Sequence, residues 1–221
     1  LNIPAREISG DFFDFYPHDD QIYFTLSDVS GKGVNAGMVM AKAITLFKIF
    51  SRQKYKPNEI LLEMNNDLHE TNPKGTFITS IIGCYNLKTD EVELSNAGHQ
   101  PALFRTDDKF IEYKSSSTPL AVTKQKNENV YTLEKFKLHG GRVYCFTDGF
   151  SECLDENQQE IGIEGVKELI NNHKNSSLKK ELENATEEIR QKSLKKDYKE
   201  KGIEEKSDIL DDDLTIIGIG K

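Results

Sequence analysis

The sequence has 221 residues, a length that fits one domain and at most two. Charged residues make up 30% and apolar residues 36%, and the presence of 12 Phe and 8 Tyr argues against a disordered chain. The net charge of −8 argues against nucleic acid as the main ligand, because binding to a phosphate backbone draws its affinity from cationic side chains.

The first half of the chain predicts one strand followed by two helices. Apolar and polar residues alternate over 22–27, which is typical of a half-buried strand, and this strand leads into Asp28. Residues 35–53 carry apolar side chains at helical spacing, and Asn35 is a candidate N-cap. Pro57-Asn58 opens a second amphipathic helix that we expect to run to residue 71.

Short strands separated by polar turns follow the two helices. We expect them at residues 77–86, 91–96, 101–106, 130–138 and 142–147, with a last one at 214–219. Two consecutive helices inserted among many strands indicate an α+β fold with packed sheets and helices outside.

The segment between the last two predicted strands is highly charged, with 22 charged residues among the 40 from Lys174 to Asp213. A narrow apolar stripe predicts a helix that docks along one face; it consists of Leu178, Leu182, Ala185 and Ile189. The stripe ends at Leu194, so we expect residues 195–206 to form a loop. An alternative hypothesis makes this segment the functional part, as an interaction helix on an inert domain.

The compartment is inferred from cysteine usage and from the lack of a membrane signal. Cys84, Cys145 and Cys153 are an odd number without paired spacing, which favours a reducing compartment, and we expect a cytoplasmic protein. No run of about 18 consecutive apolar residues predicts a membrane span. The first residue is Leu1 rather than Met, so we expect the chain to be part of a longer protein.

Acidic residues occur where the hydrophobic pattern of the chain breaks, and each is expected at a strand end. Asp11, Asp28, Asp148 and the pair Asp212-Asp213 each lie at such a position. Carboxylates gathered at neighbouring strand ends repel one another unless a cation neutralises them, and hard oxygen ligands suit magnesium or manganese. The alternative is that these residues are ordinary turn aspartates and helix caps.

Five motifs, taken together and in order, resemble the SpoIIE/RsbU-type bacterial serine phosphatases, a branch of the metal-dependent type 2C (PPM) protein phosphatases. Ser9–Asp14 (SGDFFD) is similar to the Gly-Gly-Asp-Phe-Tyr-Asp opening of that family, with Ser9 in place of its first Gly. The other four span the rest of the chain: Ser27–Gly33 (SDVSGKG), Asn96–Pro101 (NAGHQP), Thr147–Glu152 (TDGFSE) and Asp212–Thr215 (DDLT).

The resemblance implies one phosphatase domain over residues 1–221, with two antiparallel sheets in a β-sandwich flanked by helices in α/β/β/α layers. It also implies two divalent metal ions, manganese or magnesium, at one edge of the sandwich. Asp28 resembles the carboxylate that bridges the two metals, and the carbonyl of Val29 and Asp11 resemble ligands of one of them. Asp148 and Asp212 resemble ligands of the other metal, although Asp213 can replace Asp212 within the acidic run.

Other residues of these motifs have weaker assignments. Arg6 precedes Asp11 by five residues, a placement similar to the phosphate-binding arginine of eukaryotic type 2C enzymes, and it is a candidate substrate contact. Asp14 is expected to fix a loop or a water rather than to bind metal directly. His99 lies in a loop whose Asn96 and Gly98 favour a structural role over an acid or ligand role.

Two rival phosphatase chemistries do not fit the sequence. A cysteine phosphatase needs an arginine six residues after its thiolate, and those positions hold Asp90, Ser151 and Gln159. Residues 211–215 formally match the Asp-x-Asp-x-Thr motif of aspartate-nucleophile phosphatases. That motif must close the first strand of a βαβ domain, and here only six residues follow it.

The function implied by the resemblance is hydrolysis of phosphoserine or phosphothreonine on a partner protein by a water that two metal ions activate. The expected partner is a phosphorylated anti-sigma-factor antagonist, and an N-terminal sensor or receiver domain is expected in the longer protein. A homodimer is compatible with the resemblance. The alternative is a pseudophosphatase that binds a phosphoprotein without turnover, which predicts lost ligands.

Overall fold

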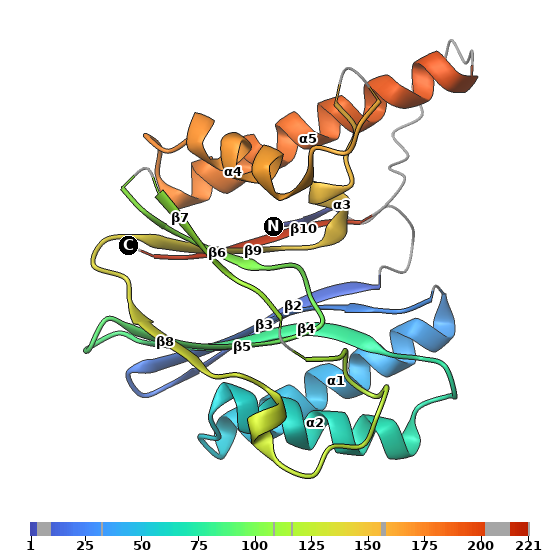
Figure 1. The fold of residues 1–221 in the computed structure, drawn as a ribbon, viewed down its shortest axis with the longest axis vertical. Helices are drawn as coiled ribbons and strands as arrows, with labels where there is room; N and C mark the ends of the chain where they lie inside the picture. Colours follow the sequence, from blue (N-terminus) through green and yellow to red (C-terminus); the bar gives the residue numbers. More distant parts are fainter. Residues whose placement is uncertain are drawn as a thin grey trace.

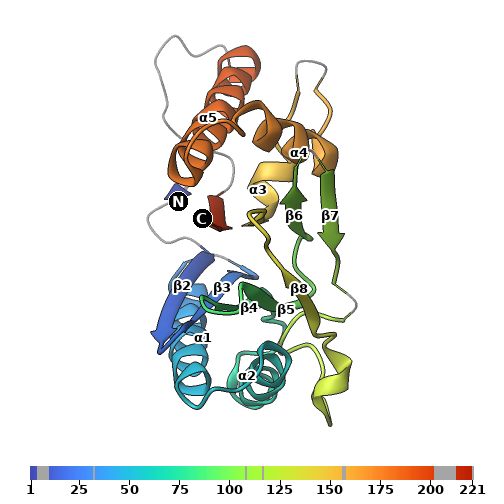
Figure 2. The same cartoon turned by 90° about the vertical axis from the view of Figure 1, so that its left-hand side faces the viewer.

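The computed structural model describes residues 1–3, 10–31, 33–107, 109–115, 117–155, 158–201 and 213–220. Two five-stranded antiparallel sheets lie face to face, and helices cover both outer faces (Figure 1). The side view in Figure 2 shows the same four layers. This architecture confirms the α+β fold class and the α/β/β/α layers expected from the sequence.

The first sheet has the strand order β2-β3-β4-β5-β8. Its strands are β2 (Asp11–His18), β3 (Gln21–Val29), β4 (Ile78–Asn86), β5 (Glu91–Ala97) and β8 (Glu134–Lys137). The helices α1 (Val34–Arg52) and α2 (Pro57–Thr71) cover its outer face (Figure 1). A short 3-10 turn, η1 (Glu128–Val130), precedes β8.

The second sheet has the strand order β1-β10-β9-β6-β7. Its strands are β1 (Asn2–Ile3), β10 (Leu214–Ile219), β9 (Arg142–Phe146), β6 (Ala102–Thr106) and β7 (Lys109–Tyr113). Its outer face carries α3 (Asp148–Ser151), α4 (Gly162–Asn172) and α5 (Leu178–Lys201). The last strand therefore lies inside a sheet, between the first strand and β9.

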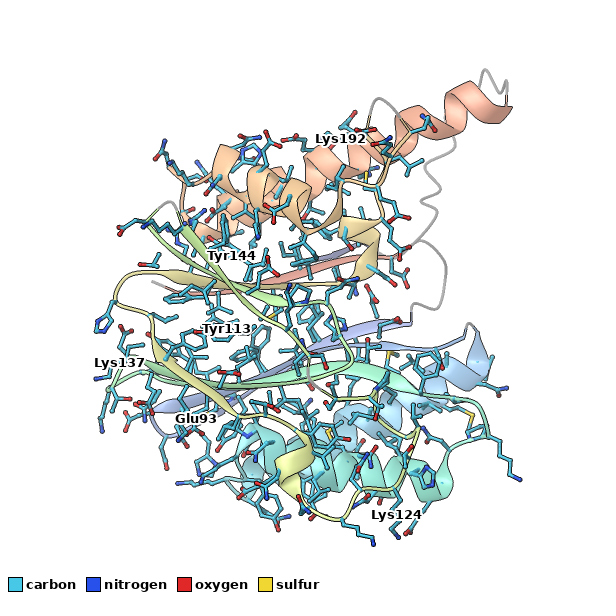
Figure 3. All side chains as sticks on the ribbon, viewed as in Figure 1. Glu93, Tyr113, Lys124, Lys137, Tyr144 and Lys192 are labelled. Carbon is cyan, nitrogen blue, oxygen red and sulfur yellow. The ribbon has the colours of Figure 1, made fainter. Side chains whose placement is uncertain are left out.

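Strand alternation separates the interior into layers. Phe24 and Leu26 of β3 belong to the apolar cluster between the sheets, whereas Tyr23 and Val29 belong to the cluster beneath α1 and α2. Side chains fill the space between the sheets, where Tyr113 of β7 stacks on Phe136 of β8 (Figure 3). By the same alternation, Asp28 lies on the face that looks toward the second sheet.

The structure corrects several sequence-based expectations. Asn35 is not the cap of α1, because the helix begins at Val34 with Gly33 at the N-cap and without a side-chain cap. The expected strand at 130–138 is only 134–137. The strands β1, β2 and β7 and the helix α4 were not predicted.

The charged segment is more helical than expected. The stripe Leu178, Leu182, Ala185 and Ile189 does pack against the outer face of the second sheet, as predicted. However, α5 continues to Lys201, where a loop was expected from residue 195. Lysine and glutamate are good helix formers, and a docked helix is extended at little cost. Residues 202–206 lie outside the described part of the chain.

By length and composition alone, α1 is apolar enough to cross a membrane, with a mean hydropathy of 1.3 over its most apolar window. In the structure it is the helix that packs Val39, Ala43 and Phe47 against α2 and the first sheet. Packing of this kind is the ordinary reason for an apolar helix in a folded domain, so the hydropathy is weak evidence of a span.

Candidate active site

Three polar residues form a row across one end of the first sheet. Asp11 is the first residue of β2 and lies directly opposite Asp28, near the end of β3. Asp28 in turn lies opposite Thr79 on β4. Residues directly opposite one another in an antiparallel pair share a face of the sheet. The row therefore ends the apolar layer between the sheets, at the end of the molecule where α3 lies (Figure 1).

Two threonines of the second sheet meet this row at Asp11. Thr147 follows β9 and Thr215 belongs to β10, and both hydroxyls donate to Oδ2 of Asp11, over 2.6 and 2.7 Å. The two threonines are also joined to each other, because the backbone N–H of Thr215 donates to Oγ1 of Thr147 over 3.2 Å. Asp11 thus connects the two sheets at this end.

The carboxylate of Asp11 is in an unfavourable place for a negative charge. Asp11 is only 5% exposed to solvent. Burial raises its pKa to about 8, the hydrogen bonds from Thr147 and Thr215 oppose this rise, and the charges of Asp28 and Asp213 add to it. A cation beside Asp11 would remove the cost of its ionisation.

Gly10 allows several oxygens to come close together. Its N–H donates to Oδ2 of Asp213 over 3.1 Å, and its carbonyl accepts from the N–H of Val29 over 3.1 Å. A Cβ at this position would lie 2.9 Å from both Oδ1 of Asp28 and the carbonyl oxygen of Val29. These two oxygens are the ones predicted to bind the same metal. They both lie next to Gly10, and a side chain at that position would collide with them.

Asp148 begins α3 directly after Thr147, and it is half-buried. The following residue, Gly149, packs so closely on the residue before β10 that a Cβ there would lie 2.2 Å from the carbonyl oxygen of Asp213. The turn that carries Asp148 is therefore fixed against the segment that carries Asp213.

The described residues do not contain a complete set of metal ligands, since no three His, Cys, Asp or Glu side chains among them are grouped as a ligand set. The structure brings Asp11 and Asp28 together and holds Asp213 beside Gly10. The predicted ligand Asp212 and the candidate substrate contact Arg6 lie outside the described residues.

The remaining candidates have other surroundings. Asp14 points away from the row, forming an ion pair with Lys48 of α1 over 2.9 Å, so it connects β2 to a helix. The thiols of Cys84 and Cys145 are buried, and burial raises their pKa to about 11 and about 12. A nucleophilic cysteine needs a lowered pKa, which agrees with the exclusion of cysteine chemistry.

Thr147 and Thr215 were not among the candidates from sequence reasoning. Thr147 immediately precedes the predicted ligand Asp148, and Thr215 follows the predicted ligand Asp212 by three residues. This proximity was the only feature of the sequence that pointed to them. Their bonds to Asp11 span 136 and 204 residues of sequence, so no local pattern contains them.

Two packed sheets between helices, with acidic residues at one end, define the class of type 2C phosphatase folds. The SiaA-PP2C domain of Pseudomonas aeruginosa superposes with a TM-score of 0.80 at 17% identity, covering 100% of this chain and 83% of that one. RsbX in complex with magnesium superposes with a TM-score of 0.67 at 16% identity, covering 99% and 91%. At these identities the similarity shows the fold.

Sequence comparison supplies the family. Residues 18–220 match the model of the family described as Stage II sporulation protein E (SpoIIE). The chain belongs to the SpoIIE family, as its motifs predicted. Phosphoserine phosphatase RsbU of Bacillus subtilis (strain 168) is 24% identical over 189 residues, which cover 83% of this chain and 55% of RsbU. The chain thus spans about half the length of this relative.

Proposed function

We propose that this chain is a metal-dependent protein-serine/threonine phosphatase domain that hydrolyses a phosphoserine or phosphothreonine of a partner protein. The observation that carries the proposal is the end of the sandwich at which Asp11, Asp28 and Asp213 gather around Gly10. Family membership supports it, because RsbU, a relative, is a phosphoserine phosphatase by name.

The residues present fit divalent metal ions. Asp11 is buried, and its ionisation is opposed by burial and by two neighbouring carboxylates. Asp28 Oδ1 and the Val29 carbonyl lie around one point beside Gly10. Hard oxygen donors that crowd together in this way are typical of magnesium and manganese sites. Metal chemistry also agrees with the magnesium complex of RsbX, a protein of the same fold.

The proposed ligands are the predicted ones: Asp11, Asp28, the Val29 carbonyl, Asp148 and Asp212. When bound, two divalent ions supply Lewis acidity and a water of lowered pKa for attack on phosphorus. The chain itself holds the ligands in place: Thr147 and Thr215 fix one oxygen of Asp11, and the strand register fixes Asp28 beside it.

The substrate and the setting belong to the same proposal. RsbU and RsbP of Bacillus subtilis are named phosphoserine phosphatases, and one solved relative joins RsbU and RsbW domains. These names support a phosphoprotein substrate, and we propose an anti-sigma-factor antagonist in that role because the resemblance of the motifs implies it. We further propose that residues 1–221 form one catalytic domain of a longer cytoplasmic protein with an N-terminal sensor or receiver domain.

A pseudophosphatase is the second candidate. It predicts that ligand positions have been lost, whereas Asp11, Asp28, Asp148 and Asp212 are all present in the sequence. The phosphatase is therefore the better-supported function.

The test is phosphate release from a phosphoserine peptide with added manganese, beside a reaction with chelator and the variants Asp28→Asn and Asp148→Asn. We expect metal-dependent release that both variants abolish. Asp19→Asn is the matched control, because Asp19 lies at the far end of the β2–β3 hairpin, with a side chain 69% exposed. No phosphate release together with no manganese binding by calorimetry would favour the pseudophosphatase instead, whereas manganese binding without turnover would indicate a domain that needs its N-terminal activator.

A further inference from the structure

His99 is buried at the end of the sandwich where Asp11 and Asp28 lie. It belongs to the connection between β5 of the first sheet and β6 of the second. This connection crosses from one sheet to the other (Figure 1). The residue is 8% exposed. Its Nδ1 lies 2.7 Å from Oγ1 of Thr79, and the ring also has a hydrogen bond with the backbone of Phe146, the last residue of β9.

The loop that carries His99 is held by several independent contacts. The N–H of His99 donates to Oδ1 of Asn96 over 2.9 Å, and Nδ2 of Asn96 donates to the carbonyl of Gln100 over 3.0 Å. Gly98 has a φ of 68°, and a Cβ there would lie 2.6 Å from Cγ of Pro119. A left-handed glycine packed on proline accepts no other residue without strain, so the inward direction of the imidazole is fixed by the backbone.

The contact to Thr79 leads directly to the site. Thr79 lies opposite Asp28 across the β3–β4 pair, and Asp28 lies opposite Asp11. Side chains directly opposite in an antiparallel pair are about 4.5–5.5 Å apart at Cβ. The hydrogen bond with the backbone of Phe146 joins the ring to the strand end that precedes Thr147. His99 therefore stands between the strand that holds Asp28 and the strand end that leads to Asp148.

A packing role alone does not explain an imidazole here. Burial lowers the pKa of His99 to about 4, so the ring is neutral at ordinary pH, with one donor and one acceptor nitrogen. Taking two polar ring nitrogens out of water costs free energy that an aliphatic side chain would avoid, unless hydrogen bonds within the protein offset it. The hydrogen bond to Thr79 is the property that a leucine of similar size would lack.

We propose that His99 is a positioning residue of the active site: its bond to Thr79 holds the end of β4, and through it Asp28, at the place required for metal binding. The inference rests on the proposed function, because Asp28 is there a metal ligand. His99 itself touches neither metal nor substrate in this proposal.

The test measures manganese affinity by calorimetry in His99→Leu, Thr79→Val, the double variant and Thr79→Ser. Removal of the bond should weaken manganese binding about 10-fold or more, in the range seen for residues that orient metal ligands. The double variant should bind no more weakly than either single variant. Thr79→Ser keeps the hydroxyl and should bind like the wild type. His173→Leu is the control, because His173 is hydrogen-bonded to Glu188 on the outer helices.

A folded His99→Leu or Thr79→Val protein that binds manganese as tightly as the wild type would overturn the inference. So would a double variant whose loss is the product of the two single losses. If the wild type itself binds no manganese, the proposed function fails. Chemical unfolding of the wild type, His99→Leu, Thr79→Val and the double variant then tests the bond between His99 and Thr79 directly. If the loss in the free energy of unfolding of the double variant equals the sum of the two single losses, the bond is refuted. A loss smaller than that sum supports the bond.

Discussion

At the scale of single residues, the site depends on close approach rather than on acidic residues alone. Asp11 reaches its position because Thr147 and Thr215 donate to it from the other sheet. Gly10 leaves space for the oxygens of Asp28 and Val29. A small change at either place should therefore affect the site more than the fold.

Gly10→Ala tests this close approach. The new Cβ would lie 2.9 Å from a carboxylate oxygen and from a backbone carbonyl, so at least one must move. We expect manganese affinity to fall about 10-fold or more, while the free energy of unfolding of the metal-free protein falls by about 1–3 kcal/mol. Calorimetry and urea unfolding measure the two quantities, and an unchanged affinity would show that these oxygens do not bind the metal.

The thiols give a second prediction at this scale. Cys84, Cys145 and Cys153 are 4%, 0% and 7% exposed. The pKa of Cys145 is raised by burial from 9.0 to about 12, so the thiol stays neutral in the folded protein. The raised pKa lowers stability only above about pH 9, where the unfolded thiol ionises. An aromatic disulfide reagent at pH 8 should label all three thiols in urea and none rapidly in buffer; rapid labelling of the folded protein would contradict this.

At the scale of elements, α5 is fixed near its start by a buried ion cluster. Glu181 is fully buried and accepts from Arg105, from Arg142 over 2.5 Å and from Tyr144 over 3.0 Å. Tyr144 lies beneath the outer helices in Figure 3. Both arginines come from strands of the second sheet, β6 and β9. The cluster thus determines where α5 sits on that sheet.

Glu181→Gln should destabilise the domain strongly, because it leaves two partly buried guanidinium groups without their counter-charge. A loss of about 3–5 kcal/mol in the free energy of unfolding is typical when one partner of a buried pair is removed. Glu183→Gln is the control, since its side chain is 48% exposed and forms a surface ion pair with Lys179, and a loss below about 1 kcal/mol is expected. Equal losses for Glu181→Gln and Glu183→Gln in urea unfolding would show that the buried cluster stabilises the domain no more than a surface ion pair does.

Sequence reasoning succeeded at this scale where periodicity is strong. The helices expected at 35–53 and 58–71 are Val34–Arg52 and Pro57–Thr71, and most strands lie within two residues of their predicted bounds. It missed β2, whose Pro17 and acidic residues do not look like a strand; at the edge of a sheet, proline is tolerated. The extension of α5 was missed because helix propensity, not an apolar stripe, continues it.

The sequence motifs predicted the acidic residues of the candidate site but not the partners that hold them. Asp11 and Asp28 were expected to lie together, and they are register partners. Their threonine partners and the His99–Thr79 bond depend on pairing between strands distant in sequence, for which a single sequence carries no local pattern. The order of strands within each sheet was unpredictable for the same reason.

At the scale of the whole molecule, metal and fold should stabilise each other. Of the proposed ligands, Asp11 and Asp28 belong to the first sheet and Asp148 follows β9 of the second, so a bound metal would join the two sheets. Manganese at 100 times its dissociation constant adds about 2.7 kcal/mol of stability. For a domain of 221 residues this corresponds to a rise of about 5–10 °C in Tm. Calorimetric scanning should show one transition that moves with manganese in the wild type and stays fixed in Asp28→Asn; an equal shift in the variant would contradict the assignment.

The place of β10 also has a consequence for synthesis. Thr215, which bonds Asp11, is 204 residues away from it, and β10 lies between β1 and β9 rather than at an edge. Domains assemble as units once their strands are available. On the ribosome, the first sheet with α1 and α2 can form early, but Asp11 gains the second of its two threonine partners only after residue 215 has left the exit tunnel. A nascent chain should therefore have no phosphatase activity until this last strand emerges.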